Sequence, residues 1–280
     1  MSLEFDLHLH STASDGTLSP TALVERAAAA GVRTLALTDH DTTEGVAEAA
    51  VAAARAGLAF VPGVEVSVTW HGGTVHVVGL GVDPADATLQ QGLAGLRAFR
   101  DWRAEEIGRR LSKEGVPGTL ERARALSNGR LISRTHFARA LVERGLAGSV
   151  RDVFKRFLVH GRPGHVPGQW ADLAAAVRWI TAAGGQAVIA HPARYVLSRT
   201  QFRRLLEEFK AAGGVGLEVL SGSHSLDDSR LMASHAQAFG LLASAGSDYH
   251  GPEQPYLEIG RLPAMPAGCT PIWHRRDLAA

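Results

Sequence analysis

The feature that most constrains this 280-residue sequence is a regular alternation of short apolar segments with longer helical ones. Apolar runs predict strands, and glycine or Ser-Pro signals bound the helices between them. We expect strands at 3–10, 34–38, 59–68, 74–82, 186–190, 215–220 and 241–245. We expect helices at 21–30, 42–56, 172–183, 198–212 and 226–239. Alternating strands and helices imply parallel strands with right-handed crossovers, and about seven of them favour a closed barrel over an open sheet.

The alternation is interrupted in the middle of the chain. Residues 86–114 have a helical pattern, and helical stretches with glycine breaks continue to about residue 160 without a clear strand. The chain length suits one large domain that carries a small insert. We therefore predict an α/β barrel in two parts, residues 1–96 and 163–280, with an all-helical insert domain at 97–162.

The insert carries most of the positive charge. The whole chain has a net charge of +1, but residues 97–162 contain 16 Lys/Arg and 7 Asp/Glu. A basic stretch can be the solvated face of helices, or it can be a surface that receives an anion. The position of the polar residues elsewhere favours the second interpretation.

Composition also indicates a compartment. Cys269 is the only cysteine, so no disulfide can form within one chain, which fits a reducing cytoplasm. The first residues lack a basic start followed by an apolar run, and no apolar segment reaches about 18 residues. We expect a cytoplasmic protein with no signal peptide and no membrane segment, and nothing in the sequence implies a protein partner.

Potential metal ligands follow nearly every predicted strand. His8 and His10 are two residues apart, so both imidazoles point to the same face of the first strand. Catalytic groups of β/α barrels lie where strands end and loops begin. The candidate ligands are His8, His10, Asp15, His40, Glu65, His76, His191, Asp248 and His250. A single histidine near a strand end is usually structural, but six at one barrel rim favour a metal site.

The ligand set predicts the kind of metal and its chemistry. Imidazoles and carboxylates without thiolates suit Mn²⁺, Fe²⁺ or Zn²⁺ rather than Ca²⁺ or Cu⁺. Nine ligands exceed the need of one ion, so we expect two or three, with Glu65 as the bridging carboxylate. Such clusters lower the pKa of bound water and clamp the oxygens of a phosphate ester. Asp6 and Asp39 are expected to orient imidazoles rather than to bind metal.

Seven short motifs resemble, in order, those of the PHP (polymerase and histidinol phosphatase) family. They are DLHLHS at 6–11, SDG at 14–16, LTDHD at 37–41, GVEVS at 63–67, HVVG at 76–79, AHP at 190–192 and GSDYH at 246–250. The resemblance implies a distorted (β/α)₇ barrel, the PHP fold, with a trinuclear metal site, manganese being the first candidate. Carried over by position, one ion would be held by His8, His10, Glu65 and Asp248. A second would be held by Glu65, His76 and His191, and a third by Asp15, His40 and His250.

Two further segments resemble a subgroup of stand-alone bacterial phosphoesterases that act on nucleotides. They are ISRTHF at 132–137 in the insert and EVLSGSHS at 218–225. That subgroup is associated with removal of the 3′-phosphate from nucleoside 3′,5′-bisphosphates and with 5′→3′ exonuclease action on short 5′-phosphorylated RNA. The resemblance therefore implies a phosphorylated nucleotide or short RNA as substrate, and hydrolysis by metal-bound hydroxide.

Several residues are candidates for substrate contacts. Arg134 is the first choice for the non-reacting 5′-phosphate, because a guanidinium binds phosphate with two hydrogen bonds, and Ser133 and His136 lie beside it. Arg194 could bind the reacting phosphate or form a structural ion pair. His224, beside Ser223, could bind phosphate or protonate the leaving O3′.

Trp170 could stack on a base, although a core position is equally compatible with the sequence. The insert has few aromatic residues for stacking, which favours a small nucleotide over RNA. Exoribonuclease action on short 5′-phosphorylated RNA is the main alternative. Histidinol phosphate phosphatase, a deaminase or amidohydrolase, and a nucleotide-binding module without catalysis are weaker ones.

Overall fold

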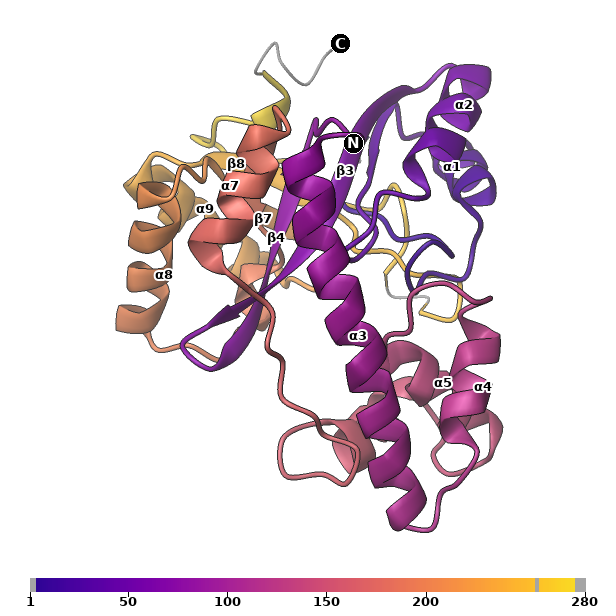
Figure 1. The fold of residues 1–280 in the computed structure, drawn as a ribbon. Coiled ribbons are helices and arrows are strands. Elements are labelled where there is room, and N and C mark those ends of the chain that lie inside the picture. The colour runs from indigo at the N-terminus through magenta and orange to yellow at the C-terminus, as the bar shows by residue number, and fades with distance from the viewer. Residues whose placement is uncertain (1–3, 255–256, 275–280) are drawn as a thin grey trace.

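The computed structural model describes residues 4–254 and 257–274, in which seven strands form a barrel-shaped sheet (Figure 1). The strands pair in the order β1 (Phe5–Asp6), β2 (Thr34–Leu37), β3 (Ala59–Trp70), β4 (Gly73–Leu80), β6 (Gln186–Ile189), β7 (Gly216–Ser221) and β8 (Leu242–Gly246). A hydrogen bond from Leu7 N to Ala245 O (2.9 Å) joins the two ends of this series. The short β5 (Ala171–Asp172) pairs only with β3. The predicted α/β barrel is confirmed.

One strand runs against the predicted direction. β4 is antiparallel to both of its neighbours, β3 and β6. The link between β3 and β4 is a tight turn in which His71 and Gly72 both have positive φ, 45° and 79°. Positive φ at both central positions is typical of a two-residue hairpin turn, which reverses the chain without a crossover helix. The expectation of parallel strands throughout is therefore wrong at β4.

The first strand is shorter than its sequence pattern predicts. Regular pairing covers only Phe5–Asp6, and residue 3 of the predicted strand lies outside the described residues. Beyond β1 the backbone still follows the end of β8, with hydrogen bonds from Asp248 N to His8 O (2.9 Å) and from His10 N to Tyr249 O (3.0 Å). This pairing places the first two histidines directly beside the last two candidate ligands.

Five helices cover the outside of the sheet. They are α1 (Pro20–Ala29), α2 (Val46–Ala56), α7 (Leu173–Ala182), α8 (Arg199–Ala211) and α9 (Leu226–Phe239). The Ser19 hydroxyl accepts a hydrogen bond from Ala22 N, and Pro20 is the first residue of α1, as the sequence predicts. Figure 1 shows α1 and α2 on one side of the barrel and α7, α8 and α9 on the other.

The interior of the barrel is apolar at the end where the parallel strands begin. Its core consists of Leu7, Ala36, Val61, Val78, Leu80, Val188, Ala190 and Ile272. The turn Ile272–His274 closes this end, and Trp273 stacks on Phe5 with ring centroids 4.3 Å apart. Because apolar side chains fill the end where the strands begin, the buried polar residues are confined to the opposite end.

A helical insert extends from the barrel. It contains most of α3 (Ala87–Lys113), α4 (Thr119–Leu126), α5 (Arg134–Glu143), α6 (Val150–Val153) and a π-helical turn at Phe154–Leu158. On α3, Leu89, Leu93 and Leu96 pack in the core between the sheet and its outer helices, whereas Ala104, Ile107 and Leu111 pack in a separate core with Phe137 and Leu141. The predicted boundary at residue 97 thus lies inside one continuous helix.

None of the described helices is both long and apolar enough to cross a membrane.

Candidate active site

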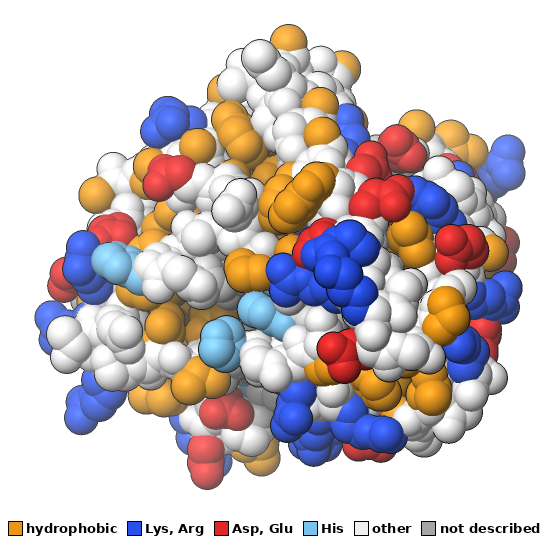
Figure 2. Space-filling model, turned by 60° about the horizontal axis from the view of Figure 1, so that its bottom comes forward, with side chains coloured by type: hydrophobic (Ala, Val, Ile, Leu, Met, Phe, Trp, Pro, Cys, Tyr) orange, Lys and Arg blue, Asp and Glu red, His pale blue; other side chains and the backbone are white. Residues whose placement is uncertain are grey.

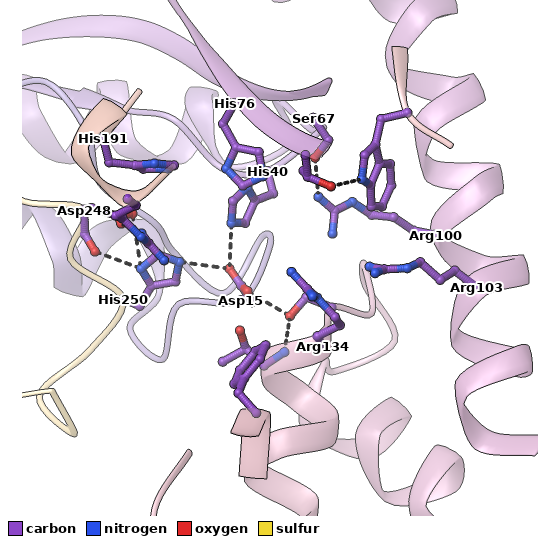
Figure 3. Close-up of a pocket in the computed structure, with 16 residues that line it drawn as sticks. Asp15, His40, Ser67, His76, Arg100, Arg103, Arg134, His191, Asp248 and His250 are labelled. Atoms are coloured by element: carbon purple, nitrogen blue, oxygen red, sulfur yellow. Dashed lines mark hydrogen bonds and ion pairs between the residues drawn. The ribbon is translucent and has the colours of Figure 1, made fainter. Parts of the chain in front are cut away.

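Nine side chains that are distant in sequence meet at the carboxyl end of the barrel. His8 and His10 follow β1, His40 follows β2, and His191 follows β6. Glu65 and His76 lie within β3 and β4, Asp15 lies in the first loop, and Asp248 and His250 follow β8. Figure 3 shows Asp15, His40, His76, His191, Asp248 and His250 pointing into one cavity. They are the nine candidate ligands of the sequence.

Glu65 is the centre of this cluster. It is fully buried, and its Oε1 lies 2.8 Å from His76 Nδ1, 3.0 Å from His191 Nε2 and 3.4 Å from His8 Nε2. Its Oε2 lies 2.7 Å from His40 Nδ1 and 3.4 Å from His10 Nε2. Burial opposes ionisation of this carboxyl, but the imidazoles around it hold the pKa of Glu65 well below its usual value.

Two other carboxylates complete the cluster on either side. Asp248 Oδ1 lies 3.3 Å from His10 Nε2 and 3.6 Å from His8 Nε2, and those two nitrogens are 3.0 Å apart. Asp15 Oδ1 lies 3.3 Å from His250 Nε2. Every one of the nine candidates therefore has a donor atom close to a donor atom of another candidate.

The donor atoms fit divalent cations. Three groups have all their ligand atoms within 4.8 Å of one another: His10, Asp15, His40 and His250; His8, His10 and Glu65; and His40, Glu65 and His76. Asp15 Oδ1 and Glu65 Oε2 are buried without a hydrogen-bond partner among the described residues. Burial lowers the pKa of His10 to about 3 and that of His76 to about 4, so both imidazoles are neutral near pH 7, as metal ligands must be.

The backbone is constrained where donors must converge. His191 and Asp248 adopt positive φ, 28° and 56°, which is uncommon for residues other than glycine and accumulates at functional sites. At Gly246 a Cβ atom would lie only 2.1 Å from His8 Cβ, so no larger residue fits there. Both features let loops of the barrel rim approach each other closely.

Glu218 is a buried residue of the site that sequence reasoning did not assign. Its Oε1 accepts a hydrogen bond from His8 Nδ1 (2.6 Å), and its Oε2 accepts one from the His191 backbone N–H. It therefore fixes the ring of one candidate ligand and the loop of another. An acidic residue within the otherwise apolar strand β7 was the available signal.

Asp6 and Asp39 act differently from the prediction. Asp39 accepts hydrogen bonds from the backbone and hydroxyl of Ser11 and from the Ser14 hydroxyl, and so it holds the loop after β1. Asp6 accepts from Ser247 N (2.8 Å), and burial raises the pKa of Asp6 to about 7. Neither side chain forms a hydrogen bond to an imidazole in the described residues, so both position backbone instead.

The wall opposite the donor cluster is formed by arginines, as Figure 3 shows. Arg100 on α3 donates to Asp41 Oδ2 (2.7 Å) and to Ser67 Oγ (2.9 Å). Arg103, one turn further on, donates only to the carbonyl of Val166 and has no acidic partner in the described part of the chain. Burial, with Arg134 and Arg100 nearby, lowers the pKa of Arg103 to about 9. An anion in the cavity would relieve this unfavourable charge.

Arg134 contributes to the same wall from the first turn of α5. Its guanidinium lies 5.4 Å from the ring centre of Phe154, and it forms no hydrogen bond or ion pair with any described residue. Burial and the neighbouring Arg100 and Arg194 lower its pKa to about 10. Sequence reasoning found Arg134 but missed Arg100 and Arg103, whose spacing of three residues on a basic helix was the available signal.

Three other predicted substrate residues line the cavity but have partners within the protein. Arg194 is half-exposed and donates to Asp248 Oδ2 (2.6 Å), so it forms the ion pair that the sequence left open. Ser133 donates to Asp15 Oδ2 (2.8 Å). Trp170 donates to Thr74 Oγ1 (3.2 Å), and the guanidiniums of Arg100 and Arg103 lie 5.0 and 5.1 Å from its ring centre.

His136, Ser223 and His224 do not line this cavity. His136 is buried, and its Nδ1 accepts a hydrogen bond from Ser133 N, which caps α5. His224 has Nδ1 3.2 Å from Val219 O and Nε2 3.4 Å from Ala193 N, so both ring nitrogens are engaged away from the cavity. The expected phosphate contact or acid role of His224 lacks a free nitrogen here. Ser223 lines a groove that adjoins the cavity.

The fold and the site define a class of protein, a β/α barrel whose rim can hold a cluster of cations opposite a basic wall. A sequence model of the PHP domain matches residues 6–219, and the chain belongs to the PHP family. It is 52% identical over 276 residues to a 3′,5′-nucleoside bisphosphate phosphatase of Chromobacterium violaceum, covering 98% of this chain and 96% of the relative. It is 44% identical over 271 residues to a 5′-3′ exoribonuclease of Escherichia coli, covering 96% and 92%.

A solved structure from Chromobacterium violaceum, described as an amidohydrolase with bound sulfate and no metal, has the same fold. Its TM-score is 0.94 and its identity 51%, and the match covers 97% of this chain and 95% of that one. That description and the phosphatase name of the curated relative differ in reaction class. Hydrolysis of amides and of phosphate esters both require an activated water, so the basic wall, rather than the donor cluster, distinguishes them.

Proposed function

We propose that this protein is a metal-dependent phosphoesterase that hydrolyses the 3′-phosphate of nucleoside 3′,5′-bisphosphates to give nucleoside 5′-monophosphates. The observation that carries the proposal is a cavity with a cluster of candidate metal ligands on one wall and, on the other, Arg103 and Arg134, which have no acidic partner among the described residues. A substrate with two phosphates matches both walls. Of the relatives named above, one is a 3′,5′-nucleoside bisphosphate phosphatase, which supports the same assignment.

In this proposal the donor cluster binds two or three ions. His8, His10, Glu65 and Asp248 would hold one; Glu65, His76 and His191 a second; and Asp15, His40 and His250 a third. Manganese is the first candidate, with iron and zinc as alternatives of similar ligand preference. When bound, the ions supply a water of lowered pKa and neutralise charge on the scissile phosphate.

The protein's own residues bind and orient the substrate. Arg134 and Arg103 would take the 5′-phosphate, because neither guanidinium has an acidic partner among the described residues. Arg194, tethered to Asp248 at the edge of the donor cluster, would contact the reacting phosphate. Trp170 would support the arginines and offer an apolar face to the nucleoside. Glu218 keeps His8 in the orientation that presents Nε2 to the other donor atoms of the cluster.

The proposal is tested with Mn²⁺-loaded protein and three nucleotides. Adenosine 3′,5′-bisphosphate should release phosphate rapidly, 5′-AMP should release none, and 3′-AMP should show a raised KM because it lacks the second phosphate. Release of phosphate is followed with a colorimetric assay, and the product is identified by chromatography. Equal turnover of 5′-AMP and the bisphosphate, or turnover of neither, contradicts the assignment.

The second candidate function is 5′→3′ exoribonuclease action on short 5′-phosphorylated RNA. It breaks the same P–O3′ bond, so it needs the same donor cluster. One observation favours it: the cavity adjoins a second groove, with which it shares five lining residues.

We also propose that the protein works in the cytoplasm, on the basis of its single cysteine and its nucleotide substrate.

A further inference from the structure

A groove leads away from the donor cluster between the insert and the barrel rim. It shares Thr135, Phe154, Arg194, Asp248 and His250 with the central cavity. Its remaining wall comes from α6 on the insert side and from the loops after β7 and β8 on the barrel side. Cavity and groove therefore form one path, with the arginines of α3 at one end and the groove at the other.

The lining of the groove is partly apolar, with Val150, Phe154 and Leu257, and its polar part offers unused hydrogen-bonding groups. Arg151, in the first turn of α6, is exposed and forms no hydrogen bond or ion pair with the described residues. Gln254, on the opposite side, is half-buried, and its side-chain amide has no partner among them. Figure 2, which brings the insert end of the molecule forward, shows Lys and Arg side chains gathered near the middle of this face. This chemistry suits a phosphate-linked chain better than an apolar ligand.

The chemistry of the two candidate substrates indicates which part of a substrate would lie in the groove. In both, water adds its oxygen to phosphorus, the P–O3′ bond breaks, and O3′ takes a proton. The substrates differ in one substituent: besides O3′, the phosphorus of the bisphosphate carries three terminal oxygens, whereas in RNA one of these three is O5′ of the next nucleoside. If the 5′-phosphate occupies the Arg103–Arg134 end, that next nucleoside must leave on the opposite side.

We propose that the groove binds the nucleoside that follows the scissile phosphate of an oligonucleotide, and that Arg151 and Gln254 determine how well that part of the chain is held. The inference rests on the proposed function. Arg151 contacts the next phosphate of the chain, and Gln254 contacts the sugar or base beside it. The bisphosphate ends at the donor cluster and does not enter the groove.

The test compares two substrates in two variants. Arg151→Ala removes the groove charge, and Gln254→Trp fills the groove. Each should lower kcat/KM for a 5′-phosphorylated trinucleotide about tenfold or more, corresponding to one lost charged contact, and leave kcat/KM for adenosine 3′,5′-bisphosphate within about twofold. Lys155→Ala is the matched control, since Lys155 is exposed on the next turn of the same segment but does not line the groove.

The outcomes separate the inference from the function on which it rests. Equal losses on both substrates, or no loss on the trinucleotide, overturn the groove assignment. A wild-type enzyme that leaves the bisphosphate intact overturns the proposed function instead. Binding of the two ligands, measured by competition with a fluorescent 5′-phosphorylated trinucleotide in the presence of EDTA, tests the groove without catalysis. There Arg151→Ala should weaken only the trinucleotide, and unchanged trinucleotide binding contradicts the proposal.

Discussion

The two walls of the cavity satisfy their charges in opposite ways. On the barrel side, the Glu65 carboxylate has five imidazoles within 3.4 Å, so its acidic group has its partners inside one cluster. On the insert side, Arg103 meets a carbonyl and an aromatic face, and Arg134 meets only an aromatic face. The first wall can hold cations and so supply the chemistry; the second presents guanidiniums that can bind an anion and so supply selectivity.

The two walls are nevertheless connected. Helix α5 of the insert reaches the barrel rim, where Ser133 donates to Asp15 Oδ2 and Arg139 donates to Asp15 O. Arg100 on α3 donates to Asp41, in the loop after β2. Changes on the barrel side should therefore abolish turnover, and changes on the insert side should alter which substrates are bound.

The largest effect is expected at the centre of the donor cluster. Glu65→Gln removes the carboxylate charge at the centre of the five imidazoles, so the affinity of the cluster for metal falls. The stabilisation of the transition state by the bound ions is then lost. A loss of several kcal/mol corresponds to a decrease of about 10³-fold or more in kcat. Elemental analysis should show fewer metal ions per chain. Glu44→Gln, an exposed change, is the control, and full activity with normal metal content in Glu65→Gln would remove the cluster from the mechanism.

A smaller effect is expected at Glu218, which supports the donor cluster by its hydrogen bond to His8. Glu218→Gln keeps the shape of the side chain but weakens its hydrogen bond to His8 Nδ1. Loss of such an outer contact typically costs about 10–100-fold in metal affinity or activity. The Mn²⁺ concentration for half-maximal activity should rise, and excess Mn²⁺ should restore part of kcat. Unchanged Mn²⁺ dependence would show that Glu218 serves only the fold.

The barrel side was predictable from sequence and the insert side largely was not, for a physical reason. Donors such as His8 and His10 follow strands, and a barrel brings all strand ends to one rim, so local patterns specify a distant meeting. The arginines lie on helices whose burial depends on how the insert packs against the barrel. The spacing of Arg100 and Arg103 places both on one helix face, but the sequence does not distinguish a buried basic face from a solvated one. The antiparallel direction of β4 was missed because strands alternate with helices in most of the chain, which predicts crossovers. The two-residue turn between β3 and β4 was therefore not recognised as a hairpin.

On the insert side the effect should appear in binding. Arg134→Ala should raise KM for adenosine 3′,5′-bisphosphate about tenfold, since a hydrogen bond to a charged group contributes about 1.5–3 kcal/mol, and leave kcat little changed. The KM for 3′-AMP, which lacks the 5′-phosphate, should not change. Arg139→Ala, which removes a contact to Asp15 O instead, is the contrasting variant. An equal rise in KM for both nucleotides would place Arg134 outside the 5′-phosphate site.

The smallest effect concerns the stability of the insert rather than the reaction. Burial lowers the pKa of His136 to about 4 from an ordinary value of 6.5, so the unfolded chain binds the proton more tightly than the folded one. Stability is therefore fully present above pH 6.5 and is lost as the pH falls toward 4, and about 1 kcal/mol should disappear between pH 7 and pH 5.5. His136→Gln keeps a side chain that can cap α5 but cannot titrate, so its urea unfolding should depend less on pH across that interval. Identical pH dependence in both proteins would show that His136 does not contribute to it.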